Sequence, residues 1–237
     1  MRDNRSIVHF DLDAFFVNVE YLRNTRLRGK PIAVGGHSDR GVIASCSYEA
    51  RKFGVHSAMP TRLAKRLCPE LIIIRGDMDS YSRFSNLVTE IIRDEVPIFE
   101  KSSIDEFYID MTGMDKFFGV TRYVQHLRKK IIEESGLSIS HALATNKLIS
   151  KVATNECKPN GQLEILAGNE KSFLAPLPIE KMPMVGSQTA TLLRRMGVET
   201  ISILSQIPVE MMTNLLGKNG IDLWRKANGI DETPIVP

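Results

Sequence analysis

The order of apolar and polar residues divides the chain into blocks with strand-like and helix-like spacing. Apolar residues run almost continuously through residues 6–10, as in a buried strand, and then recur at helical spacing through residues 15–22. Later blocks predict a helix, two strands, a helix, a strand and a final helix, at residues 80–95, 98–102, 107–111, 120–134, 138–144 and 146–156. This order predicts an α+β fold with a ferredoxin-like βαββαβ core.

The first half of this core is interrupted by residues 15–79, where short elements are separated by glycine and proline turns. Short strands are expected at residues 32–34, 41–45 and 71–74, and short helices at residues 48–53 and 60–67. We therefore expect a small, compact insertion.

From residue 165 to residue 234 the pattern changes to short helical blocks broken by proline and glycine, which predicts a separate small all-helical domain. Within it, residues 183–186 precede helix-forming residues and resemble the second half of a helix–hairpin–helix. The amides of Val185, Gly186 and Ser187 would then hold a DNA phosphate. An ordinary helix–loop–helix packing unit is the alternative.

Composition and charge limit the partners and the cellular location expected for the protein. The 237 residues are 43% hydrophobic and carry a net charge of +3, with basic residues grouped in a way that suits a nucleic-acid partner without establishing one. No apolar run approaches the roughly 20 residues of a membrane span, and the N-terminus lacks a secretory signal pattern. Cys46, Cys68 and Cys157 form neither a zinc motif nor a disulfide framework, so we expect free thiols, a cytoplasmic location and no membrane partner.

Two acidic clusters lie far apart along the chain, each next to a predicted strand. The first contains Asp11 and Asp13, and the second contains Asp105 and Glu106. Carboxylates gathered at strand ends repel one another, and a divalent cation is the usual way to offset that repulsion. Each cluster alone could also be a set of solvated loop carboxylates, but together they make metal-assisted phosphoryl chemistry the first hypothesis.

Nucleotidyl transfer of this kind uses two Mg²⁺ ions, and Mn²⁺ can substitute. Asp11 and Asp105 can bridge both ions if their strands are neighbours, Glu106 can complete one site, and the main-chain carbonyl of Leu12 can add an oxygen. Asp105 and Glu106 would point to opposite faces of a regular strand, so Asp105 is expected in the turn before it.

Positively charged groups are candidates for binding a triphosphate. Tyr48 and Arg51 are three residues apart on a predicted short helix and therefore share a face. Lys158 precedes a strong turn signal at residues 159–161, which would present its ammonium from a fixed loop. The alternatives are a packed tyrosine, a surface arginine and a solvated lysine.

These segments together resemble the Y-family, or translesion, DNA polymerases, and within them the DinB-like (DNA polymerase IV) branch. The matching stretches are FDLDAFFVNVE at residues 10–20, YEARKFGV at 48–55, SIDE at 103–106 and KPNG at 158–161. They occur in the order and spacing of that family.

The resemblance implies a palm at residues 1–14 and 80–166, fingers at 15–79 and a thumb at 167–234. It implies that Asp11, Asp105 and Glu106 are catalytic, with the same residues and Leu12 as metal ligands. The residues implied to contact the nucleotide are Phe15, Phe16 as the steric gate beneath the sugar, Tyr48, Arg51 and Lys158. The implied partners are primer–template DNA and deoxynucleoside triphosphates, used by a monomer with low fidelity during DNA damage tolerance.

The sequence departs from the family pattern in three places. Met184 replaces a thumb glycine and Ala142 replaces a glycine in a core strand. The C-terminal little finger domain is absent, so we expect a shortened chain with weaker DNA binding, and a sliding clamp would be contacted through the missing region. A non-catalytic scaffold and a nucleotidyl cyclase are the alternative functions. The intact carboxylates argue against the scaffold, and the insertion and helical domain argue against the cyclase.

Overall fold

The computed structural model describes residues 5–36, 38, 40–114 and 119–237, and its centre is the strand β1 (Ile7–Leu12). All six residues of β1 are buried. Because side chains alternate along a strand, Val8, Phe10 and Leu12 point into the main hydrophobic core while His9 and Asp11 point to the opposite face. One side of the strand therefore contributes to the hydrophobic core, and the other side contributes His9 and Asp11 to a polar layer.

The main sheet has the strand order β5-β6-β1-β7-β8, with β1 in the middle. Its other strands are β5 (Phe99–Lys101), β6 (Glu106–Asp110), β7 (Ile139–Ala144) and β8 (Gln162–Glu164). The first four strands of this order pair antiparallel, which is the arrangement of a ferredoxin-like sheet. The predicted α+β class is confirmed.

The strand β8 is not predicted by the hydrophobic pattern. It pairs parallel to β7 at the edge of the sheet, and Leu163 is the single apolar residue among its three. A strand this short shows no alternation that sequence reasoning can detect.

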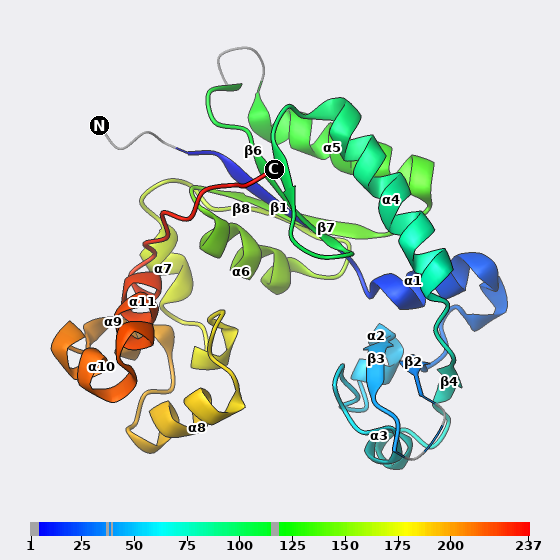
Figure 1. Ribbon diagram of the computed structural model, residues 1–237, viewed down its shortest axis with the longest axis horizontal. Coiled ribbons are helices and arrows are strands. Elements are labelled where there is room, and N and C mark those ends of the chain that lie inside the picture. The colour runs from blue at the N-terminus through cyan, green and yellow to red at the C-terminus, as the bar shows by residue number, and fades with distance from the viewer. Residues whose placement is uncertain (1–4, 37, 39, 115–118) are drawn as a thin grey trace.

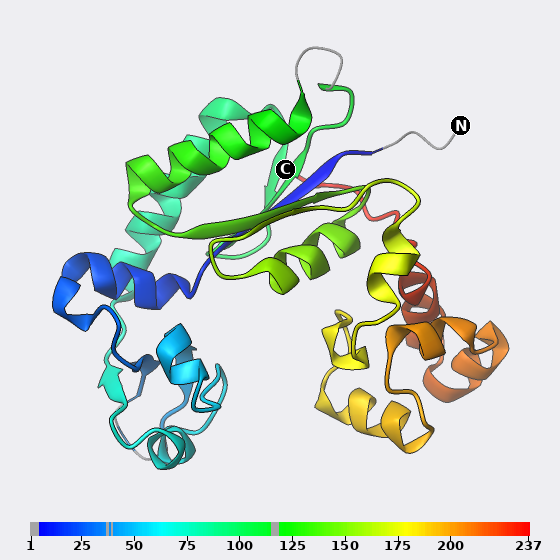
Figure 2. The same ribbon diagram turned by 180° about the vertical axis from the view of Figure 1, so that it is seen from behind.

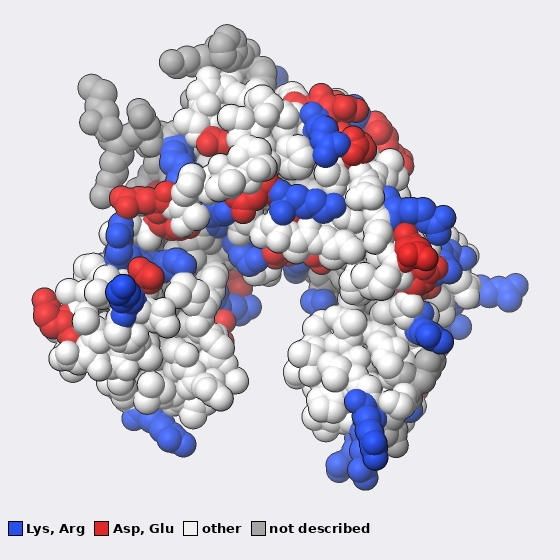
Figure 3. Space-filling model, in the orientation of Figure 1, with Lys and Arg blue, Asp and Glu red and all other residues white. Residues whose placement is uncertain are grey.

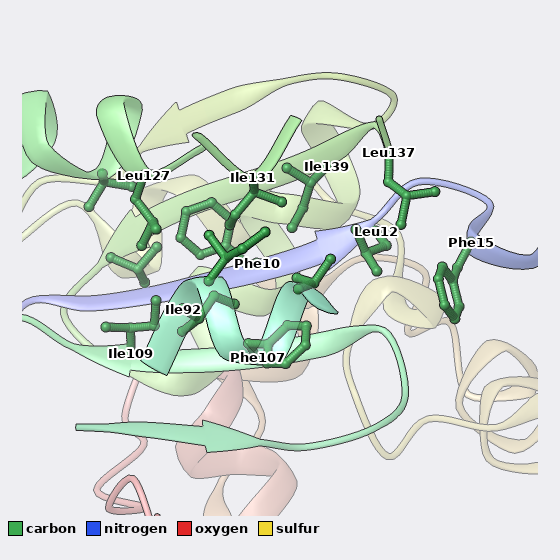
Figure 4. Packing of buried hydrophobic residues seen from close by; sticks show 14 of the residues in the cluster. Phe10, Leu12, Phe15, Ile92, Phe107, Ile109, Leu127, Ile131, Leu137 and Ile139 are labelled. Atoms are coloured by element: carbon green, nitrogen blue, oxygen red, sulfur yellow. The ribbon is translucent and has the colours of Figure 1, made fainter. Parts of the chain in front are cut away.

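Helices cover both faces of the main sheet (Figure 1). On one face α4 (Met78–Glu95) and α5 (Val120–Ser135) pack side by side over the core, and on the other α6 (Lys147–Cys157) packs against β1 and β7. Phe10, Phe107, Leu127 and Ile131 interdigitate between sheet and helices (Figure 4). Dense apolar packing of this kind holds β1 in register with its neighbours.

The insertion forms a second body, here called the small-sheet lobe. It comprises β2 (Ile32–Gly35), β3 (Ile43–Cys46), α2 (Tyr48–Arg51), α3 (Thr61–Leu67) and β4 (Ile72–Ile74). The strands form a sheet of order β3-β2-β4 with its own small core. The helix α1 (Phe15–Arg23) and the short 3-10 helix Thr25–Leu27 lead into it from β1.

The C-terminal part forms a helical lobe. It comprises α7 (Glu170–Leu174), a 3-10 helix (Ile179–Lys181), α8 (Ser187–Arg195), α9 (Ile201–Gln206), α10 (Val209–Leu216) and α11 (Lys218–Ala227). Its core includes Leu148, Ile149 and Val152 of α6, so the lobe is packed directly onto that helix. Among the described residues, no helix combines the length and apolar character needed to cross a membrane.

The two lobes lie on the same side of the main sheet, at opposite ends of α6 (Figures 1 and 2). Figure 3 shows that the molecule is hollowed between them. The polar face of β1 is turned toward this side, because α6 covers that face.

Gly161 closes the turn that connects α6 to β8. Its amide donates to Ser140 Oγ at 3.1 Å, its carbonyl accepts from the amide of His141 at 3.2 Å, and a Cβ at this position would lie 1.8 Å from the carbonyl oxygen of Cys157. The backbone must therefore move to accept any other residue.

We predict that Gly161→Ala lowers the free energy of unfolding by about 2–3 kcal/mol, because the turn cannot keep these hydrogen bonds and also accommodate a methyl group. Denaturant unfolding measures the loss. Gly119→Ala is the control, because a Cβ there meets nothing within 4 Å, and its cost should stay below about 1 kcal/mol. Equal stability of the two variants would contradict the prediction.

Candidate active site

The two acidic clusters meet in the β1–β6 ladder. Asp11 lies directly opposite Glu106, and the amide of Leu12 donates to the carbonyl of Asp105 at 3.0 Å. The antiparallel register therefore brings the carboxylates of both clusters to one end of the strand pair.

Asp105 lies in the turn before β6, outside the strand, as the alternation argument required. Ser103 organises this turn: its hydroxyl donates to Asp105 Oδ1 at 2.6 Å and accepts from the amide of Glu106 at 3.1 Å. Asp105 is consequently free of strict alternation and can face the same region as Glu106.

A cleft between the main sheet and the small-sheet lobe collects most of the predicted site residues. Its lining includes Asp11, Leu12, Phe15, Phe16, Arg51, Asp105 and Lys158, together with Ala14, Ala44, Ser45 and Ser57. These residues come from four separate parts of the sequence, at residues 11–16, 44–57, 105 and 158. Glu106 lies beside this group, opposite Asp11.

The aromatic pair at the start of α1 has one buried and one accessible member. Phe15 is 2% exposed and belongs to the core, whereas Phe16 is half-buried. The ring of Phe16 stacks on Tyr81 with a centroid distance of 4.3 Å and an interplanar angle of 18°. Tyr81 is itself fully buried and donates to Glu20 Oε1 at 2.8 Å, so Phe16 rests on a fixed surface.

Arg51 and Tyr48 share one face of α2, as their spacing predicted. The guanidinium carbon of Arg51 lies 4.6 Å from the centre of the Tyr48 ring. Only Arg51 of this pair lines the cleft, because Tyr48 faces a neighbouring pocket that it shares with Asp13 and Pro159. Burial raises the pKa of Tyr48 above its ordinary value, and the negative charge of the nearby Asp13 carboxylate raises it further. The phenol is therefore neutral.

Asp13, the other carboxylate of the first acidic cluster, is held by hydrogen bonds within the protein. It is 1% exposed, and its carboxylate accepts from Ser138 Oγ at 2.6 Å, Ser140 Oγ at 2.8 Å and the amide of Asn160 at 2.8 Å. These bonds tie β1 to β7 and to the turn that follows Lys158. They place Lys158 beside Asp11.

Two lysines pair with the carboxylates of the site. Lys158 forms an ion pair with Asp11, and Lys151 Nζ lies 2.7 and 2.8 Å from the two carboxylate oxygens of Glu106. Burial raises the pKa of Asp11 to about 7, and the Lys158 ammonium opposes that rise. Without a further cation, the protein holds these acids only by supplying its own positive charge.

His9 is a further buried group of this layer. It is fully buried, its ring centre lies 4.6 Å from that of Tyr108 with the two rings tilted by 48°, and its Nε2 lies 3.8 Å from Glu106 Oε1. Neither ring nitrogen has a hydrogen-bond partner among the described residues. Burial lowers the pKa of His9 well below its ordinary value, and the positive charges of Lys151, Lys158 and Lys147 lower it further. The imidazole is therefore neutral.

The donor set fits a divalent cation. Ligand atoms of His9, Asp11 and Glu106 all lie within 4.8 Å of one another, and Asp105 lines the adjoining cleft. Carboxylate oxygens are the ligands that Mg²⁺ prefers, and imidazole nitrogen is also accepted by Mn²⁺ and later transition metals. A cation at this point would stabilise the ionised form of Asp11, whose pKa is raised by burial.

The predicted thumb hairpin lies in the helical lobe, away from the cleft. Gly186 immediately precedes α8 as its N-cap, and Ser187 is the first residue of the helix. Met184, which replaces the glycine of the family pattern, adopts φ = 77° and is exposed. The backbone therefore keeps the left-handed conformation that favours glycine, although a side chain is present.

Sequence reasoning did not single out Lys151, His9 or Tyr81. Lys147 and Lys151 are four residues apart on the predicted helix and so share a face, which was an available signal. His9 precedes Asp11 by two residues and so shares its strand face, which also could have been noticed. Nothing in the sequence reveals that Tyr81 lies beneath Phe16.

Comparison with known proteins gives one family and consistent relatives. The profile of the impB/mucB/samB family matches residues 10–155. Over 233 residues the chain is 41% identical to DNA polymerase IV of Dehalococcoides mccartyi, covering 98% of this chain and 60% of that relative. It is 41% identical to DNA polymerase IV of Treponema denticola over 97% of this chain and 58% of the relative, so it spans about three fifths of their length.

Solved structures have the same fold. The crystal structure of DinB from Sulfolobus solfataricus superimposes with a TM-score of 0.88 at 28% sequence identity, covering 97% of this chain and 69% of that one. An insertion ternary complex of Dbh DNA polymerase superimposes with a TM-score of 0.86, also at 28% identity and with the same coverage. The agreement extends over both lobes and the main sheet.

We predict that Asp11 makes stability depend on pH when divalent metal is removed. An aspartate whose folded-state pKa is raised to about 7 binds a proton on folding, so its contribution is fully present below about pH 4 and is lost as the pH rises through 7. The unfolding free energy of the wild type minus that of Asp11→Asn should fall by about 3–4 kcal/mol between pH 4 and pH 8. Denaturant unfolding in a chelator measures it, and parallel pH profiles would contradict the assignment.

Proposed function

The chain belongs to the impB/mucB/samB family, the Y-family of DNA polymerases, and from this premise we propose that it is a DNA-directed DNA polymerase of the translesion type. It would add deoxynucleotides to a primer 3′ end by two-metal-ion nucleotidyl transfer. The observation that carries the proposal is the meeting of Asp11, Asp105 and Glu106 at one end of the β1–β6 ladder, beside a cleft lined by an arginine and a lysine.

The carboxylates of Asp11, Asp105 and Glu106 and the main-chain carbonyl of Leu12 would hold two Mg²⁺ ions. When bound, such ions activate the primer hydroxyl and neutralise charge on the reacting phosphate. Mn²⁺ would substitute, since the donor atoms suit either ion. The protein's own part is to fix the carboxylates, which Ser103 does for Asp105 and the strand register does for Asp11.

The cleft supplies groups for the nucleotide. Arg51 and Lys158 would bind the triphosphate, because guanidinium and ammonium groups form charge-assisted hydrogen bonds to phosphate oxygens. Phe16 would lie beneath the sugar and exclude a 2′ hydroxyl by contact. Tyr48 would support Arg51 through its ring and contact the phosphates once the nucleotide is in place, and Phe15 would back Phe16 from the core.

The three bodies of the structure would be the palm, fingers and thumb of a polymerase. We assign the palm to residues 1–14 and 80–166, the fingers to 15–79 and the thumb to 167–234. Residues 1–4, 37, 39 and 115–118 of these ranges lie outside the described residues. Primer–template DNA would occupy the hollow between the two lobes, with the thumb amides of Val185, Gly186 and Ser187 on a phosphate.

The size of the fingers lobe, the state of the cysteines and the presence of the three carboxylates are each consistent with this assignment. A small fingers lobe checks little of the nascent base pair, which suits synthesis of low fidelity opposite damaged templates. All three cysteines are free, as expected for a protein that works in the reducing cytoplasm. A non-catalytic scaffold is disfavoured because all three carboxylates are present and backed by specific contacts.

The decisive experiment is Mg²⁺-dependent primer extension. Asp105→Ala should lower the rate of deoxynucleotide addition by at least about 100-fold, because a carboxylate that holds the reacting charge is lost. Asp110→Ala is the matched control: Asp110 lies at the other end of β6, caps a local turn and should extend primers at close to the wild-type rate. Equal extension by wild type and Asp105→Ala would refute the proposed site.

The sugar gate is tested separately. Phe16→Ala should lower the preference for deoxynucleotides over ribonucleotides, as a ratio of kcat/KM values, by about 10- to 100-fold, because the ring no longer blocks a 2′ hydroxyl. Single-nucleotide incorporation with dATP and ATP opposite the same template base measures the ratio. Unchanged sugar discrimination would remove Phe16 from this role and leave the polymerase assignment intact.

A further inference from the structure

The helix α6 carries a row of lysines that face the carboxylates of the palm. Lys147 Nζ lies 2.7 and 2.8 Å from the two carboxylate oxygens of Glu100, and Lys151 Nζ lies at the same distances from those of Glu106. Lys158, one residue after the helix, pairs with Asp11. The proposed triphosphate contacts use Lys158 but leave Lys151 without a function.

Lys151 is the cation held against Glu106. Both carboxylate oxygens contact its ammonium, whereas His9 Nε2 lies farther away, at 3.8 Å, and the Asp11 carboxylate opposite carries the same charge as Glu106. The side chains of Glu106 and Lys151 are 19% and 30% exposed, so the pair is partly shielded from water but is not sealed off from it. An ion pair at this depth is considerably stronger than one on an open surface.

A divalent cation at the site would need the same oxygens that Lys151 contacts. An ammonium within hydrogen-bond distance of these oxygens repels a cation that approaches them, because both carry positive charge. Metal binding to Glu106 and ammonium binding to Glu106 must therefore compete.

We propose that Lys151 is a positioning residue that acts as the resident counter-cation of Glu106, holding the carboxylate in place before metal binds and giving it up when a divalent cation arrives. The inference rests on the proposed metal site. It explains why a long basic side chain is directed at a carboxylate that already has a catalytic role. It also implies that the free protein binds divalent ions more weakly than its carboxylates alone would allow.

The chain provides an internal control for the loss of an ion pair. Lys147 and Glu100 form a pair with the same distances one helical turn away, but Glu100 accepts from the amide of Val236 and does not belong to the group of possible ligands formed by His9, Asp11 and Glu106. Lys147→Met and Lys151→Met thus remove equivalent contacts from one helix, and only the second frees a carboxylate of the site.

The test is Mn²⁺ binding to the full chain without DNA or nucleotide, measured by electron paramagnetic resonance of free Mn²⁺. Lys151→Met should lower the Kd for Mn²⁺ by about three- to tenfold, since a competing like charge is removed. Lys147→Met should stay within about twofold of wild type, and Lys151→Arg should keep the weak binding because it keeps the charge. Thermal unfolding in a chelator checks folding, and both methionine variants should melt a few degrees below wild type.

Glu106→Gln separates this inference from the proposed function. If Glu106→Gln binds Mn²⁺ as well as wild type, Glu106 is not a metal ligand, and the metal site and the inference both fail. If Glu106→Gln weakens binding while Lys151→Met leaves the Kd unchanged or raises it, the metal site stands and the role of Lys151 is overturned. Tighter binding in Lys151→Met that disappears in the double variant with Glu106→Gln supports the inference.

Discussion

Two carboxylates face one another across the ladder in the interior of the main sheet, and the negative charge that they bring has to be balanced within the protein. Asp11 and Glu106 are cross-strand neighbours, a position where like charges destabilise a sheet. Lysines from one helix and from the turn after it supply the compensating charge. The packing of α6 on β1 and β7 is therefore both a hydrophobic and an electrostatic requirement of the fold.

The alternation of β1 allows one strand to meet this requirement and to anchor the core at the same time. Phe10 and Leu12 are buried among the helices α4 and α5, while His9 and Asp11 face α6. A shift of the register by one residue would place the carboxylate in the core and a leucine in the site. The precision of the site thus comes from the hydrophobic packing on the other side of the strand.

The helix α6 also links the site to the helical lobe and to the C-terminal segment. Its apolar residues belong to the core of that lobe, and its N-terminus is held by Asp231, whose carboxylate accepts from the amide of Leu148 at 3.0 Å. Asn146 donates to the carbonyl of Gly229 at 3.0 Å. The same helix carries Lys151 and ends just before Lys158. Contacts of the C-terminal segment with α6 therefore help to position the two lysines that pair with the carboxylates of the site.

The sequence by itself determined most of the helices and strands of the main sheet and indicated the chemistry proposed for this protein. Periodicity located β1, α4, α5 and α6, because hydrophobic spacing is a local property, and the motifs around Asp11, Asp105 and Lys158 indicated metal and phosphate chemistry. It also required Asp105 to lie in a turn, since alternation along a strand is local too. Tertiary structure alone decided which side chains meet: Glu106 opposite Asp11, Tyr81 under Phe16, Lys151 against Glu106, and Tyr48 in a pocket beside the cleft. Those contacts depend on strand register and helix packing between residues far apart in the chain, and no local pattern records them.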